Sequence, residues 1–123
     1  MKQTPEAFTS LSNAWNEKDL TKIRSEVDKS VAENIVFADP SNYIHGIEAF
    51  ETMVKDFRVK YPESVVKRTS GLDSHNNRFR YSWEIYIGEM MIVKGFDVAT
   101  LNENGLIERI DGFFGDLSPL ESY

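Results

Sequence analysis

RFRYSWEIYIGEMMIVKGFDVATL, residues 78–101, has the composition of two long strands joined by a short turn at Gly88-Glu89. Aromatic and β-branched residues dominate both arms, as is typical of strands. A two-residue turn pairs each residue before it with one residue after it. We therefore predict an antiparallel hairpin in which Arg80 lies opposite Asp97.

Two further segments extend this hairpin into a meander. Val65–His75 precedes it and Leu106–Phe114 follows it, and the turn-forming stretches 76–77 and 102–105 separate them. A two-residue turn at 76–77 places Asp73 opposite Arg80. Because cross-strand neighbours share a face of the sheet, Asp73, Arg80 and Asp97 are expected to form one row over three strands.

The two faces of this predicted sheet differ in chemistry. The row of charges is either an ion-pair ladder at an open sheet edge or the polar floor of a ligand pocket. The opposite face is too apolar to be left in water. We expect a second copy of the chain to cover that apolar face, which carries Phe79, Tyr81, Trp83, Ile85, Ile92 and Phe96.

The first half of the chain has helical signals. Apolar residues recur at helical spacing in residues 5–15, 20–31 and 47–60. A short strand, 34–38, ends at the turn-forming cluster Asp39-Pro40-Ser41-Asn42. Helices followed by an antiparallel meander indicate an α+β domain, and 123 residues fit a single domain over residues 1–123.

Composition argues against several classes of partner. The net charge is −6 and the basic residues are scattered, which disfavours nucleic acid. No apolar run approaches the roughly 20 residues needed to cross a bilayer, and no signal-peptide core is evident, so we expect a cytoplasmic protein without a membrane contact. There is no cysteine, and His45 and His75 lie far apart, so we expect no metal site.

Two groups of motifs carry a family resemblance. The first is Ile35 to Pro40 followed by Gly46 to Phe50, a strand, an acidic turn, a glycine and a helix. The second comprises the sheet segments 78–83, 94–97, 104–107 and 112–114. Together they resemble the SnoaL-like, polyketide cyclase-like proteins of the nuclear transport factor 2-like superfamily. The resemblance implies a cone-shaped, cystatin-like α+β barrel, whose curved antiparallel sheet wraps around helices and encloses a pocket. It also implies a homodimer formed through the convex sheet face.

The resemblance also implies candidate catalytic residues. Asp39 matches the general base of the superfamily's steroid isomerase, and Asp97 matches its protonated oxyanion-hole aspartate; that enzyme is a worked example in general accounts of pKa tuning. Leu11 stands where the isomerase has its oxyanion-hole tyrosine, so steroid isomerisation is not what the match predicts. Arg80 could replace Asp97 as the oxyanion group if the two pair. His75 could move protons as in the SnoaL-like cyclases, although a histidine beside a turn is more often a solvated surface residue.

Three functions therefore remain open. The first is an enzyme without cofactor that isomerises, cyclises or hydrolyses a small carbonyl or polyketide-like substrate. The second is a binding protein for an apolar ligand, and the third is a dimerising module with a vestigial pocket. The fold by itself does not choose among the three. Side chains expected around the pocket ligand, several of which are equally explained by core packing, are Trp15, Phe50, Val54, Phe57, Ser82, Glu84 and Phe114.

Overall fold

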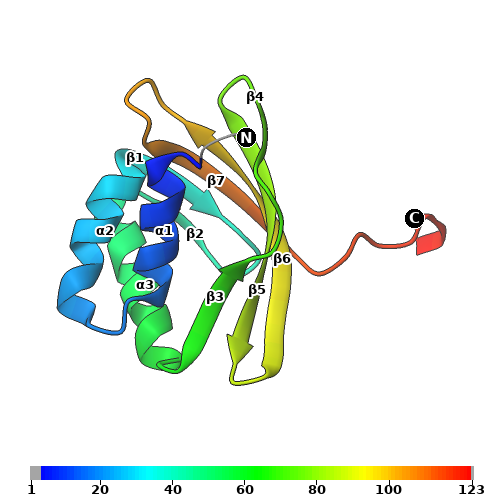
Figure 1. Cartoon of the computed structure of the whole chain (residues 1–123). Coiled ribbons are helices and arrows are strands. Elements are labelled where there is room, and N and C mark those ends of the chain that lie inside the picture. Colours follow the sequence, from blue (N-terminus) through cyan, green and yellow to red (C-terminus); the bar gives the residue numbers. More distant parts are fainter. Residues whose placement is uncertain (1–3, 123) are drawn as a thin grey trace.

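The computed structural model describes residues 4–122 and has two layers (Figure 1). Three helices lie against one face of a curved, unclosed sheet. The segment after the last strand extends away from the body. This arrangement confirms the α+β class. No helix in residues 4–122 is long and apolar enough to cross a membrane.

The helices are α1 (Glu6–Asn16), α2 (Ile23–Ser30) and α3 (Ile47–Lys60), and short 3₁₀ turns occur at Leu20–Lys22 and Leu120–Ser122. Each long helix turns an apolar stripe toward the sheet, and Phe8, Val27 and Phe50 are buried there. Gly46 precedes α3 with a φ of 93°, a left-handed conformation that glycine adopts without steric cost.

The sheet has seven strands in the order β2-β1-β7-β6-β5-β3, and β4 pairs with β5. Their bounds are β1 Val31–Ala38, β2 Tyr43–His45, β3 Ser64–Arg68, β4 Asp73–His75, β5 Arg78–Ile87, β6 Met90–Leu101 and β7 Ile107–Phe114. The segment expected as one strand over 65–75 is therefore two short strands. The sheet is also mixed rather than wholly antiparallel, because β1 runs parallel to β7.

Both predicted two-residue turns form, but the register beyond the second turn differs from the prediction. Ile87 pairs with Met90 as expected, whereas a bulge at Ile92 shifts every later pair by one residue. Arg80 consequently lies opposite Val98, and Asp97 lies opposite Tyr81. The bulge lets the adjacent apolar residues 92 and 93 both border the interior, and it leaves Lys94 beside Glu84 on the outside.

This shift also corrects the expected dimer face. Phe79, Tyr81, Trp83, Ile85 and Ile92 lie on the concave side with the helices, where Tyr81 joins the buried core and Phe79 and Trp83 pack against it. Phe96 faces the opposite way and stacks on Phe113, with ring centroids 5.3 Å apart. The convex face thus carries the charged members of β5 and this aromatic pair.

Two polar side chains anchor the helices to the edge strand β3. Arg58 of α3 is buried and donates hydrogen bonds to the backbone oxygens of Pro62 and Ser64 at 2.9 Å. Asn16, the last residue of α1, accepts from the Val66 amide at 2.7 Å and donates to the Val66 carbonyl at 2.9 Å. These contacts close one side of the space between helices and sheet.

Candidate functional site

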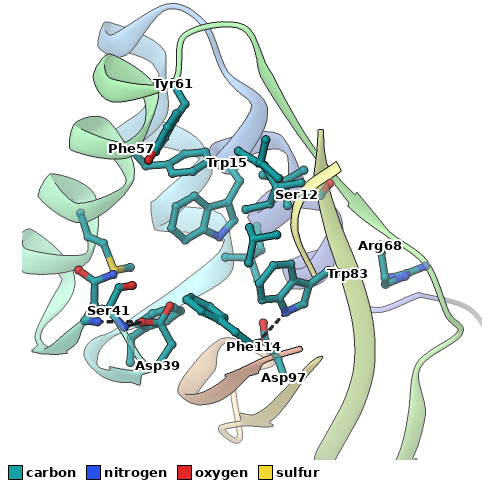
Figure 2. A pocket seen from close by; sticks show the side chains of 18 of the residues that line it. Ser12, Trp15, Asp39, Ser41, Phe57, Tyr61, Arg68, Trp83, Asp97 and Phe114 are labelled. Carbon is teal, nitrogen blue, oxygen red and sulfur yellow. Dashed lines mark hydrogen bonds between the residues drawn. The ribbon is translucent and has the colours of Figure 1, made fainter. Parts of the chain in front are cut away.

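A cavity of about 690 Å³ lies between α1, α3 and the concave face of the sheet. Its wall is mostly apolar and rich in aromatic rings, including Trp15, Phe57 and Phe114. Figure 2 shows Asp39 and Asp97 at one end of this cavity and Tyr61 at the other. A largely apolar cavity with a few converging polar groups is the usual form of a small-molecule site.

Asp97 on β6 is the most perturbed carboxyl of the cavity. The indole nitrogen Nε1 of Trp83 donates a hydrogen bond to its Oδ1 at 3.0 Å. The side chain borders the cavity and is half-buried, but protein atoms surround its carboxyl, and this desolvation raises the pKa of Asp97 to about 6. The nearby charge of Asp39 raises this pKa further, while the hydrogen bond from Trp83 and the proximity of the Tyr81 hydroxyl oppose the rise.

One glycine provides room for this carboxyl and a second provides room for the indole that binds it. A Cβ on Gly112, which pairs with Asp97, would lie 2.6 Å from the Asp97 Oδ1 and 3.3 Å from the Cβ of Asp39. A Cβ on Gly95 would lie 2.6 Å from the Trp83 indole, which therefore rests against bare backbone. Both aspartates consequently border the same small volume beside Gly112.

Tyr81 adds a hydroxyl to this end of the cavity. The residue is only 8% exposed, and its hydroxyl has no hydrogen bond of ordinary geometry to any of residues 4–122. Burial raises the pKa of this phenol well above its usual value, and the charge of the adjacent Asp97 adds to the effect. Tyr81 therefore stays protonated and can donate to a ligand oxygen.

Asp39 is held by the turn that follows β1. Its Oδ1 accepts hydrogen bonds from the backbone amides of Ser41 and Asn42, each at 2.8 Å. This is the turn-capping role that aspartate often takes before proline. Its Oδ2 accepts no hydrogen bond from the described residues, so one oxygen fixes the turn and the other is available at the cavity.

Comparison with known structures places this geometry in a family. A SnoaL-like family protein from Agrobacterium tumefaciens, provisionally classed as an isomerase, is 28% identical, with 90% of this chain and 96% of that chain covered at a TM-score of 0.83. The chain has the SnoaL-like fold of the nuclear transport factor 2-like superfamily. No model of a protein family and no curated protein sequence matches the chain.

Solved structures of lower identity share the fold alone. A protein from Jannaschia, provisionally classed as a SnoaL-like polyketide cyclase, is 13% identical, with 93% of this chain and 90% of that chain covered at a TM-score of 0.67. An epoxide hydrolase of the LEH-like type from Mycobacterium tuberculosis is 14% identical, with 90% and 81% covered at a TM-score of 0.66.

The SnoaL-like cavity contains some of the residues expected from the sequence. Asp39, Asp97, Trp15, Phe57 and Phe114 all line it. Phe50 and Val54 are fully buried in the hydrophobic core beneath it, so they support the wall without lining the cavity.

The remaining expected residues do not reach the cavity. Arg80 pairs with Asp73 at 3.1 Å on the surface, where their side chains are 75% and 73% exposed. His75 is exposed beside the turn, and Ser82 and Glu84 lie on the same convex face as Arg80. The row expected from Asp73 to Asp97 is therefore broken, because the bulge turns Asp97 inward.

Sequence reasoning missed Tyr81 and Trp83 as members of the SnoaL-like site. Lys94 carried the signal that could have found them, since an unshifted hairpin places this lysine on the aromatic face beside Trp83. A charged side chain in an apolar face indicates that the register needs a bulge. Among residues 4–122 there is no group of three or more metal-binding side chains.

Proposed function

We propose that this SnoaL-like protein is an enzyme that moves a proton on a small carbonyl compound. One observation carries the proposal: the Asp97 carboxyl and the unpartnered Tyr81 hydroxyl lie together in an apolar cavity. A pKa of about 6 suits Asp97 to general-base catalysis, because most of the group is ionised at neutral pH and it still binds a proton well.

The proposed reaction needs only these two groups. The Asp97 carboxylate takes a proton from the carbon beside the carbonyl, and the electrons of that C–H bond shift toward the carbonyl oxygen. The Tyr81 hydroxyl donates a hydrogen bond to this oxygen as its negative charge grows. Asp97 then returns a proton: to another carbon, which gives isomerisation, or, after the abstracted proton has exchanged with solvent, to the same carbon, which gives isotope exchange. The same base would serve ring closure or activate water for hydrolysis.

This assignment differs from the roles that the family resemblance suggested. Asp39 was expected to be the base and Asp97 a neutral donor. The Oδ1 of Asp39 is already occupied by two backbone amides, and Tyr81 supplies a donor from β5 in place of the one absent at Leu11. Asp97 is therefore the better candidate for the base.

The test is exchange of the α-protons of 2-tetralone, a neutral bicyclic ketone, followed by NMR in deuterated buffer. We expect exchange above the buffer rate, a loss of roughly 10²–10⁴-fold in Asp97→Asn, and a loss of about 10²–10³-fold in Tyr81→Phe. Asp39→Asn keeps an oxygen acceptor for the turn, so its exchange rate should fall less than that of either variant. A ketone that binds without exchanging protons in the wild-type protein would favour the binding-protein alternative instead.

Two parts of the proposal concern the setting of the enzyme. The cytoplasmic location is proposed from the sequence alone. A homodimer through the convex face is supported by the stacked Phe96 and Phe113, of which Phe113 is 57% exposed. Exposed aromatic pairs of this kind are typical of surfaces that bind another protein.

A further inference from the structure

We infer that the cavity takes an organic cation, an ammonium compound whose positive charge sits between Asp39 and Asp97 against the aromatic wall. This inference deepens the proposed function and rests on the same cavity, because it names the class of carbonyl substrate as one that also carries a protonated or quaternary amine. The carboxyl of Asp39 would be the anchor, and Asp97 would remain the base.

The charge balance at the cavity floor is the first argument. Two carboxyl groups flank Gly112, and none of the lysines or arginines among residues 4–122 forms a hydrogen bond or ion pair with either. Carboxylates that share a desolvated site repel each other, and the influence of Asp39 on Asp97 reflects this repulsion. A ligand cation would remove that repulsion, whereas an anionic ligand would add to it.

The wall chemistry is the second argument. Aromatic rings attract cations through the negative charge on their faces, and the effect grows when the cation is desolvated. Rings of Trp15, Phe37, Trp83 and Phe114 line the cavity together with the two aspartates. Acidic groups within an aromatic enclosure are the combination that recognises ammonium groups.

The buried Tyr81 hydroxyl is an independent sign that a polar ligand atom belongs at this end. It is 8% exposed, lies beside Asp97 and has no hydrogen-bond partner of ordinary geometry in the described part of the chain. Buried polar groups without partners are rare unless a ligand or water satisfies them. In a ligand that carries both an ammonium group and a carbonyl, the carbonyl oxygen would accept a hydrogen bond from this hydroxyl.

The cationic side chains that line the cavity lie away from its acidic end. The Lys60 ammonium sits 5.4 Å over the ring of Tyr61, which Figure 2 shows at the opposite end from Asp39 and Asp97. Arg68 lies beyond Trp83 in the same view. Neither cation therefore pairs with the two aspartates, and the net charge of −6 favours the approach of cations from solution.

A matched pair of probes tests the charge preference. Benzyltrimethylammonium and neopentylbenzene have nearly the same shape but differ by one positive charge, and phenylacetate supplies a negative charge. Both tryptophans of the chain line the cavity, so quenching of intrinsic fluorescence reports occupancy, and calorimetry checks the affinities. We expect the cation to bind at least tenfold more tightly than its neutral counterpart, and phenylacetate to bind most weakly.

Variants then locate the charge. Asp39→Asn, which keeps the turn acceptor, should reduce cation affinity about tenfold and leave neopentylbenzene unchanged. Asp73→Asn, at an exposed ion pair outside the cavity, is the matched control and should leave both affinities unchanged. Cation affinity should also rise with pH as Asp97 ionises; the groups that face Asp97 are Trp83 and Tyr81 of β5 and Asp39 beyond β1.

Equal binding of the cation and neopentylbenzene, or tighter binding of phenylacetate, would overturn the inference. So would an unchanged cation preference in both Asp39→Asn and Asp97→Asn. Exchange on 2-tetralone, which is neutral, tests proton transfer separately. The charge preference can therefore fail while the proposed function stands, and the reverse also holds.

Discussion

Replacing Asp97 by asparagine should stabilise the protein at neutral and alkaline pH. Asparagine has nearly the same shape and can still accept the hydrogen bond from Trp83, but it carries no charge to desolvate. The pKa of Asp97 is raised from 3.8 to about 6 in the folded state. The folded protein therefore binds this proton more tightly than the unfolded chain does.

The sign and size of the effect follow from this difference. In the wild-type protein, the stability that comes from binding this proton is fully present below the ordinary pKa of 3.8. It is lost as the pH rises through about 6 and Asp97 ionises. At about 1.4 kcal/mol per pKa unit, the whole loss amounts to up to about 3 kcal/mol. About 2 kcal/mol of it develops between roughly pH 4.5 and pH 8.

Urea unfolding followed by far-UV circular dichroism at these two pH values measures the effect. We subtract the free energy of unfolding of the wild type from that of Asp97→Asn at each pH. This difference should be about 2 kcal/mol larger at the higher pH. Any pH-independent cost, such as a weaker hydrogen bond to Trp83, cancels in this comparison. Asp73→Asn, at an exposed ion pair, is the control and should show little such change. A difference that is the same at both pH values would refute the burial argument for Asp97.

Four further substitutions test other parts of the structure. Gly112→Ala places a methyl group 2.6 Å from the Asp97 Oδ1, so it should lower stability by about 1–3 kcal/mol and abolish ketone exchange; unchanged exchange would show that the carboxyl position is not critical. Phe113→Asp should convert a dimer to a monomer in sedimentation velocity, and a wild-type monomer at high concentration would contradict the proposed contact. Arg58→Met removes a buried hydrogen-bonding centre and should cost roughly 2–4 kcal/mol in urea unfolding, whereas Arg80→Met removes an exposed pair and should cost less than about 1 kcal/mol; the reverse order would contradict the structure.

Local signals were sufficient to predict most of the elements. The helix bounds at Ile47 and Lys60 follow from an apolar stripe that starts after a glycine and stops before a proline. The turn at Asn76-Asn77 also formed as predicted, and both residues have the positive φ values, 46° and 63°, that such hairpin turns need. The parallel pairing of β1 with β7 was not predictable in this way, because it joins segments far apart in the chain.

The candidate site was predicted only in part, and the reason is one residue of register. The turn chemistry was right, but a bulge five residues before Asp97 in the chain exchanged the two faces of β6 relative to β5. Asp97 therefore reached the cavity as expected, while its partner became Trp83 rather than Arg80. Which residues of β6 border the cavity, including 92 and 93, depends on the register, and the information that selects it is spread over the whole fold.

The contact of Asn16 with Val66 has a consequence for aggregation. The strand Ser64–Arg68 lies at an edge of the sheet, and unpaired backbone groups at an edge can template the addition of another chain. The Asn16 side chain occupies both the amide and the carbonyl of Val66, in the middle of this five-residue strand. A helix terminus thereby blocks edge-to-edge polymerisation, and loss of this side chain would expose a short template for fibril growth.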